Sequence, residues 1–363
     1  MILSILIVSC NQSNTKKTEN PAQQTSVAEV KQKEKILPPL INVEVNLTEN
    51  DFGDIIELKG TQHIVNNIFR LSDFEMIAND SILTFKTIDK DILLFYSLPD
   101  FKLKKAFGKQ GRGPGEYAFP SLVKVENSNK LGYIYNDLTD ELNAIENSYT
   151  INKKAIKLNN SRKYNRKQIH GLSPNHLLYV ENIKRGKAVF DFKVDGDSST
   201  TKQIYNLAFS NDYKSWAAYI GNFGANASKK RFVYAYKYFK RLVFHDLENN
   251  TSKIINFDVE NLKKGSDIDI LAPTNTTYYF GISAQKNYVY VLYSGRTPIQ
   301  VRKDYNNGKK HTFIEQFDWN GNPIRKFKLD QGGLFCVNEA ENTIFIASNL
   351  EENPFYTYKL PKL

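Results

Sequence analysis

A group of short β-type segments recurs along most of this chain, with about 50 residues from one group to the next. In each group a polar turn leads into a run rich in Val, Ile, Tyr and Phe, and a second such run follows. A further run closes most groups. Four-stranded units at such a period are typical of the blades of a β-propeller. The first runs lie at residues 81–86, 131–136, 176–181, 231–238, 287–293 and 343–348, the second at 92–98, 142–146, 189–194, 241–247, 312–319 and 355–360, and the closing runs at 103–107, 154–158, 203–207, 253–257 and 324–329.

The number of groups predicts six blades. The sixth group ends at Leu363 with only three strands, whereas the upstream β-type run 54–58 belongs to no group. We therefore predict that residues 54–58 supply the missing outer strand of the sixth blade and close the ring. The predicted fold is all-β, a six-bladed β-propeller of four-stranded blades over residues 51–363. A two-sheet sandwich would also contain many short strands but would not repeat them in groups of four, and helical periodicity is sustained nowhere.

The N-terminal 50 residues predict an anchor and a tether. Residues 1–10 form a lipoprotein signal segment, because the apolar start of the chain leads into IVSC, the form of a bacterial lipobox whose Cys, here Cys10, becomes lipid-modified. The apolar run is short and no Lys or Arg precedes it, so we expect the complete signal peptide to begin upstream. Residues 11–50 are rich in Asn, Gln, Thr, Ser and Lys and are predicted to be a flexible tether. The alternative is an apolar disordered end with a chance Cys.

One loop differs from every other part of the chain. Residues 107–117 read FGKQGRGPGEY and join a closing strand to the next blade. The four glycines and one proline permit tight turns and positive φ angles. Consecutive backbone N–H groups in such a loop can form an anion-binding nest, here with Lys109 and Arg112 beside it.

This Gly-rich loop resembles the FG-x-x-GRGPGE-[FY] signature of TolB-like six-bladed β-propeller lipoproteins of Bacteroidota. Residues 289–295 (VYVLYSG) and 317–323 (FDWNGNP) are similar to the same family, and the resemblance spans roughly residues 50–363. It implies a propeller, a lipid anchor and a cell-envelope location, without catalytic residues. Surface-exported lipoproteins of that group usually carry acidic residues just after the Cys. Residues 11–18 have none, which implies an outer-membrane anchor that faces the periplasm.

The positive charge of the folded part predicts a basic mouth. The net charge is +10, and the five Lys and five acidic residues of residues 1–50 cancel. In a four-stranded blade, the loop between strands two and three shares a face with the loop that enters the next blade. The Gly-rich loop should therefore share a face with residues 184–187, 237–241 and the insert 295–311. Arg112 and Arg296 are expected to hold one carboxylate or phosphate between them. The candidate ligand-binding residues are Lys109, Gly111, Arg112, Gly113, Arg185, Arg296 and Arg302.

The alternative for this face is that the Gly-rich loop only joins two blades and that the charges are solvated. Nucleic acid is not expected as a partner, although Phe232, Tyr234, Tyr236 and Tyr238 alternate with other residues in a basic run. Their spacing of two places them on one face of a strand, where they would pack between blades.

Signals for catalysis or metal binding are weak. The five His show no paired metal spacing and no G-x-S-x-G elbow occurs, so no catalytic residue, metal or cofactor is predicted. Asp267 and Asp269 are interpreted as an exposed loop rather than a carboxylate pair. The acidic run 136–141 lacks the ligand spacing and central Gly of a calcium loop. Cys336 is expected to be a buried thiol.

The sequence therefore favours a lipid-anchored, monomeric binding or scaffolding module. Its expected partners are the membrane and an anionic small molecule, a glycan or an envelope protein. The alternative is a propeller enzyme, such as a lactonase or polysaccharide lyase, acting at the central mouth.

Overall fold

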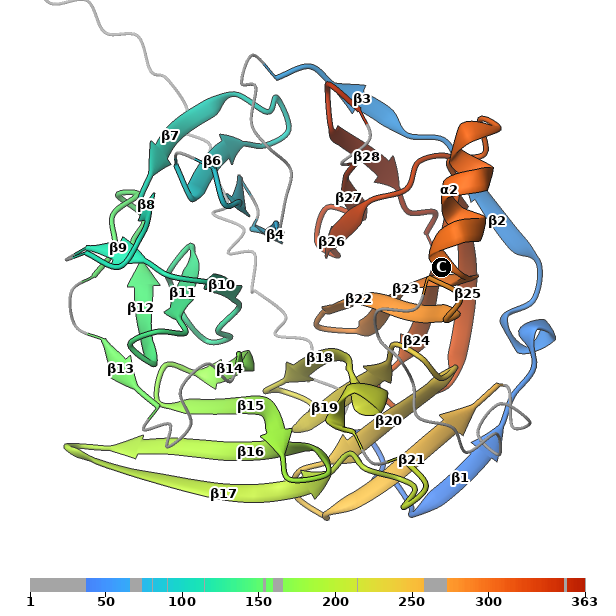
Figure 1. Ribbon diagram of the computed structural model, residues 1–363, viewed down its shortest axis with the longest axis horizontal. Helices are drawn as coiled ribbons and strands as arrows, with labels where there is room; N and C mark the ends of the chain where they lie inside the picture. Colours follow the sequence, from blue (N-terminus) through green and yellow to red (C-terminus); the bar gives the residue numbers. More distant parts are fainter. Residues whose placement is uncertain are drawn as a thin grey trace, which may run out of the picture. The chain divides into compact units, whose positions relative to one another are not determined.

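Six β-sheets lie around a central axis and form a ring (Figure 1). The innermost strands contact one another in cyclic order, β4, β10, β14, β18, β22 and β26, and β26 returns to β4. This arrangement confirms the predicted six-bladed β-propeller. The computed structural model describes residues 37–65, 74–79, 81–89, 91–113, 115–152, 155–158, 166–213, 215–257, 273–348 and 351–362.

Each blade has four antiparallel strands that follow one another from the axis outward. The predicted runs correspond to the second, third and fourth strands, and the innermost strands were not among them. Blades 1 to 3 consist of β4 (Glu75–Ala78), β5 (Ile82–Lys86), β6 (Leu93–Ser97) and β7 (Leu103–Phe107); β10 (Pro120–Val123), β11 (Gly132–Asn136), β12 (Glu141–Ile145) and β13 (Ile156–Lys157); and β14 (Gln168–Ser173), β15 (His176–Ile183), β16 (Gly186–Asp195) and β17 (Ser198–Asn206).

Blades 4 to 6 follow the same plan, with their last strand or an added strand taken from the start of the chain. They consist of β18 (Gly221–Asn226), β19 (Arg231–Tyr236), β20 (Arg241–Asp246) and β21 (Thr251–Asn256); β22 (Thr277–Ala284), β23 (Tyr288–Arg296), β24 (Thr312–Asp318) and β25 (Pro323–Leu329); and β26 (Leu334–Asn338), β27 (Thr343–Ala347), β28 (Phe355–Lys359) and β3 (Thr61–His63). A two-stranded sheet of β8 (Lys109–Gln110) and β9 (Glu116–Tyr117) and a 3-10 helix η2 (Trp216–Tyr219) lie in connections between blades.

An N-terminal strand closes the ring, as predicted, but the strand is β3 and not residues 54–58. β3 pairs antiparallel with β28 and completes blade 6. Residues 54–58 contain β2 (Ile55–Leu58), which pairs in parallel with β25 as a fifth strand of blade 5. The chain steps from one blade to the next at Gly60, where an added Cβ would lie 2.6 Å from the Tyr358 ring. Two short strands therefore replace the single predicted one.

Residues 37–58, here called the N-terminal strap, belong to the folded domain. β1 (Val43–Asn46) pairs in parallel with β21 as a fifth strand of blade 4. The 3-10 helix η1 (Glu49–Phe52) follows and buries Phe52, whose ring stacks on Phe257 at 5.7 Å and meets Phe317 edge-on at 5.3 Å. Residues 37–50 are thus not part of a flexible tether, which corrects the predicted boundary. Residues 1–36, including Cys10, lie outside the described part of the chain.

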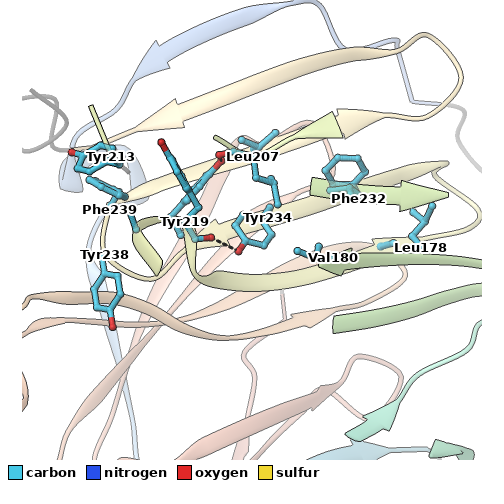
Figure 2. Close-up of a cluster of buried hydrophobic side chains, with 14 of the residues drawn as sticks. Leu178, Val180, Leu207, Tyr213, Tyr219, Phe232, Tyr234, Tyr238 and Phe239 are labelled. Atoms are coloured by element: carbon cyan, nitrogen blue, oxygen red, sulfur yellow. Dashed lines mark hydrogen bonds between the residues drawn. The ribbon is translucent and has the colours of Figure 1, made fainter. Parts of the chain in front are cut away.

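Strand β19 shows how the cores form between neighbouring blades. Phe232, Tyr234 and Tyr236 pack into a cluster with blade 3, whereas Val233 and Ala235 pack into a cluster with blade 5. Figure 2 shows the first cluster, in which the Tyr234 hydroxyl donates a hydrogen bond of 2.6 Å to a backbone carbonyl. The predicted aromatic stripe is therefore core, because alternate side chains of a strand face opposite sheets.

The insert between β23 and β24 contains an α-helix that the sequence analysis did not predict, α2 (Pro298–Asn306). A capping box begins it: the Thr297 side chain accepts from the Gln300 N–H at 3.2 Å, and the Gln300 side chain accepts from the Thr297 N–H at 2.8 Å. No residue of α2 is buried, so it lacks the apolar period by which helices were sought. In the described ranges no helix has the length and apolar character to cross a membrane.

Candidate functional site

The Gly-rich loop between blades 1 and 2 holds a carboxylate of its own. Glu116 Oε2 accepts a hydrogen bond of 2.9 Å from the Gly113 N–H. A Cβ added to Gly111 would lie 1.8 Å from the same oxygen, so any other residue there would displace the Glu116 carboxylate. The predicted anion nest is therefore occupied by Glu116. Lys109 and Arg112 are exposed beside it, and their role in ligand binding stays a prediction.

The other candidate residues of this face do not gather at one mouth. Figure 1 shows β8 and β9 on the opposite side of the ring from α2. Arg112 and Arg296 therefore do not hold one anion between them, contrary to expectation. Arg296 instead donates to Asp304 Oδ2 at 2.9 Å and to a backbone carbonyl of its own insert at 2.8 Å. Arg185, in the β15–β16 turn, and Arg302, on α2, are exposed.

Basic residues of blades 4 and 5 are neutralised in a buried network. Lys240, from the predicted mouth, and Lys326 of β25 both contact Glu315, at 3.3 and 2.9 Å. Both also contact Glu49 of the strap, Lys326 at 2.6 Å. Their ammonium groups lie 4.4 and 4.1 Å from the centroid of the Tyr293 ring. Glu315 is fully buried and Glu49 comes from the strap, so the docked strap adds a second carboxylate to this pair of lysines.

The two added strands are acidic where the blades they cover are basic. Glu44 of β1 accepts a hydrogen bond of 2.8 Å from Arg241 Nη1. Burial alone would raise the pKa of Glu44, but the hydrogen bonds from Arg241 and Asn256 lower it overall. Glu57 of β2 lies 2.7 Å from Lys328, its neighbour across the ladder in β25. Each added strand therefore carries one glutamate that pairs with a basic residue of its blade.

Buried titratable groups also connect the inner strands across the ring. Lys124, which follows β10 in blade 2, donates from Nζ to the carbonyl of Ala284 in blade 5 at 3.0 Å. Glu126 accepts from the Ala227 N–H at 2.8 Å and lies 3.3 Å from His170 Nε2. Burial lowers the pKa of Lys124, and the nearby Glu126 carboxylate opposes this effect. These groups join blades 2, 3, 4 and 5 near the axis.

Other polar residues singled out in the sequence have structural partners. Asp140, in the acidic turn of blade 2, accepts a hydrogen bond of 2.8 Å from the buried Lys167. Within the residues that the structure describes, no group of three or more His, Cys, Asp or Glu could hold a metal ion. Asp267 and Asp269 lie outside these residues. Cys336 is a buried thiol, as predicted, and burial raises its pKa to about 12.

A groove of about 890 Å³ lies between blades 3 and 4. Strands β16 and β17 line it from blade 3, and the turns at residues 227–230 and 247–250 line it from blade 4. The two turns join the first strand of blade 4 to its second and the third strand to its fourth. The Gly-rich loop instead joins the fourth strand of one blade to the first strand of the next, which places it on the other face of the ring. The groove therefore opens on the face opposite the Gly-rich loop. A cavity of about 500 Å³ adjoins it and reaches the strap at Val43 and Glu44. The groove also has apolar lining from Leu172, Leu178, Ile204 and Leu247.

One side of this groove carries a His–Asp–Lys cluster. His176 Nε2 lies 2.6 Å from Asp191 Oδ1, and Lys193 Nζ lies 3.1 Å from Asp191 Oδ2. Burial by itself would raise the pKa of Asp191, but the hydrogen bonds from His176 and Lys193 lower it overall. Asp191 therefore stays an anion that orients both neighbours.

Further lysines complete the lining. Lys230 pairs with Glu248, and both side chains are more than half exposed, at 56% and 60%, so this pair is weak. Lys202 of β17 makes no ion pair with the described residues. Three lysines thus face two carboxylates, and Lys202 lies opposite Asp191 in the ladder without forming an ion pair in the described part of the chain. The sequence analysis missed this site, since only Lys230 belonged to a recognised basic run; the one available signal was the length of the blade 3 strands.

Comparison with known proteins gives a consistent result. The profile of a family described as "TolB-like 6-blade propeller-like" matches residues 51–340. The structure of a DUF4221 family member from Bacteroides vulgatus superposes with a TM-score of 0.54 at 11% identity, covering 83% of this chain and 95% of that chain. A candidate exported protein from Bacteroides fragilis gives a TM-score of 0.52 at 10% identity, with 89% and 99% covered.

At these identities the two structures share the fold alone. No curated protein sequence matches the chain. The family profile, in contrast, spans well over half of the residues. The chain therefore belongs to the TolB-like six-blade propeller family.

Proposed function

We propose that this propeller is a lipid-anchored envelope protein that binds an anionic ligand in the groove between blades 3 and 4. One observation carries the proposal: three lysines, of which Lys202 makes no ion pair within the described ranges, surround a groove with apolar lining. The volume of about 890 Å³ falls within the range usual for small-molecule sites. This combination suits a ligand with a carboxylate or phosphate at one end and an apolar or sugar body.

The chemistry follows from the groups present. Lys193 and Lys202 can donate charge-assisted hydrogen bonds to an anion, which are about twice as strong as neutral ones. Lys193 Nζ lies 3.1 Å from Asp191 Oδ2, so this lysine is oriented before the ligand arrives. The partly exposed Ile204 and Leu247 offer apolar contact for the rest of the ligand. The basic character would also exclude cationic ligands.

The test uses inorganic phosphate and an oligogalacturonate as probes in titration calorimetry. In the variant Lys193→Gln/Lys202→Gln, two of the three groove lysines lose their charge. We expect its affinity for the better-bound probe to fall at least tenfold, because each lost charged hydrogen bond costs about 1.5–3 kcal/mol. The matched control is Lys59→Gln/Lys104→Gln, which removes the same charge from exposed positions outside the groove.

The control separates a site from general attraction. Equal weakening in both double variants would mean that the whole positive surface draws the anion, and the groove would be rejected. Absence of binding by the wild-type protein to either probe would reject an anionic ligand. Binding through the groove should also weaken at higher salt, because exposed charges are screened.

The lipid anchor is a separate part of the proposal. It is supported by the lipobox at Cys10 and by the structural likeness to a candidate exported protein of Bacteroides fragilis. Expressed with a complete signal peptide, Cys10→Ala should move from the membrane fraction to the soluble fraction. An unchanged partition of the variant into detergent would contradict the lipid anchor. It would not affect the proposal that the groove binds an anionic ligand.

A further inference from the structure

The outer strand of blade 3 departs from the rule that the other blades follow. In blades 4 and 5 the outer strands β21 and β25 are six and seven residues long, and both are covered by a strand of the strap. In blades 1, 2 and 6 the outer strands β7, β13 and β3 are five, two and three residues long, and no strand of the described chain covers them. Long edges are covered and short edges stay open.

Strand β17 is the exception. It is nine residues long, longer than any of the other five outer strands, and no strand within the described ranges pairs with its outer edge. Residues 198–203 are all exposed, and Figure 1 shows β17 along the outer rim of the ring. An uncovered edge of this length presents a row of backbone N–H and C=O groups that can pair with another strand.

The edge of β17 also carries few of the features that protect natural edges. Such features include shortness, proline and repeated lysine. The shorter edge β7 has Lys104 and Lys105, whereas β17 has no proline and only Lys202. Its register shift lies near Ile204, at the far end of the strand from Ser198. The stretch 198–202 is therefore regular and exposed, and no strand of the described chain pairs with its outer edge.

The covered blades show what kind of strand fits such an edge. β1 and β2 are both extended four-residue segments, both run parallel to the strand they cover, and each contributes one glutamate to a basic partner. Lys202 of β17 lies opposite Asp191 of β16 in the ladder but makes no ion pair with the described residues, so its ammonium group can still meet an acid on an added strand. We propose that an extended, acid-bearing segment of a partner protein adds in parallel to β17 as a fifth strand of blade 3, with its acidic residue beside Lys202.

This occupant fits better than a second copy of the chain. β17 has no acidic residue, so a second copy of it paired across a two-fold axis would bring another lysine to the seam and no carboxylate for Lys202. An acidic segment would instead place a carboxylate beside Lys202, where opposite charges attract. The proposal concerns the backbone edge of β17, so it stands whether or not the neighbouring groove binds an anion.

The experiment measures binding of a labelled peptide by fluorescence anisotropy to the full chain. The probe is the peptide GDIIELKG, which copies residues 53–60, and its control carries Glu57→Lys. Asp195 and Ser198 pair across a two-residue turn, so this pair exchanges hydrogen bonds and the N–H of Thr201 is expected to point outward. Thr201→Pro removes that donor, whereas Thr201→Val changes only the side chain.

We expect the wild-type protein and Thr201→Val to bind the probe equally, and Thr201→Pro to bind it at least tenfold more weakly. Lys202→Glu should weaken binding of the probe and strengthen binding of the Glu57→Lys peptide. This exchange of preference serves as the readout if Thr201→Pro does not fold. Equal binding by Thr201→Pro and Thr201→Val, or no binding by the wild-type protein, would overturn the proposal. A concentration-dependent dimer in sedimentation that Thr201→Pro abolishes would overturn the assignment in favour of a second copy.

Discussion

Blades 4 and 5 differ from blade 3 in how their outer edges end. The strap covers the first two with parallel strands and supplies Glu44, Glu49 and Glu57 to the basic residues there. Blade 3 has the longest outer strand and a groove beside it, but no covering strand from the described chain. In blades 4 and 5 the backbone groups of the outer edge form hydrogen bonds with the strap. In blade 3 the corresponding groups are available to water or to a partner.

The difference separates stability from binding. Lys240, Arg241 and Lys326 are buried beneath the strap and pair with its glutamates, which are themselves more than half exposed. The lysines around blade 3 are more exposed, at 55% for Lys193 and 56% for Lys230, and Lys202 makes no ion pair with the described residues. Changes in blades 4 and 5 should therefore alter the free energy of unfolding, whereas changes along β16 and β17 should alter binding more than stability.

The largest expected effect comes from removing the strap over blade 4. Deleting residues 1–53 removes β1 and η1, exposes the edge of β21 and loses Phe52, whose truncation alone would cost about 3–5 kcal/mol. We expect a loss of about 5 kcal/mol or more and a melting temperature lower by about 10 °C or more. Deleting residues 1–36 is the control and should leave melting unchanged. Equal melting of the two truncations would contradict a stabilising strap and remove the contrast with blade 3.

A smaller effect is expected from the buried charge network. Glu315→Gln removes the buried carboxylate that Lys240 and Lys326 share, and Glu49, which is 53% exposed, remains as their acidic partner in the described chain. Because two buried ammonium groups then lack most of their compensation, we expect about 3–5 kcal/mol of destabilisation in a chemical denaturation curve. Glu49→Gln removes the more solvated partner and should cost less, about 1 kcal/mol. The reverse order of the two variants would show that the strap, rather than Glu315, neutralises the lysines.

The period of the sequence was sufficient to predict the blades but not their inner strands. The second and third strands are rich in Val, Ile, Tyr and Phe because both of their faces pack between blades, as in β5, β6, β19 and β20. Among the inner strands, β14 and β18 contain polar residues and glycine instead: a Cβ added to Gly224 of β18 would lie 2.7 Å from the Cβ of Ala284 in β22. Such strands lack the apolar signal on which the sequence reading depended.

The candidate site was harder to predict than the fold. The sequence shows Lys240 and Arg296 as surface-like charges, but it does not show that acids many residues away will neutralise them. Lys326 and Glu49 are separated by 277 positions, and only the docked strap brings them together. The groove of blade 3 arises from the packing of two blades, and neither contributes a local motif.

The course of the strap has a consequence for the order of folding. Val43 pairs with Lys253, Ile55 with Lys326 and Thr61 with Thr357, so the earliest synthesised residues of the domain depend on the latest. Contacts between such distant positions require the closure of large loops and tend to slow folding. A growing chain can complete blades 1 to 3 while the strap still lacks its partner strands. We therefore expect the ring to be sealed after translation, by the segment that left the ribosome first.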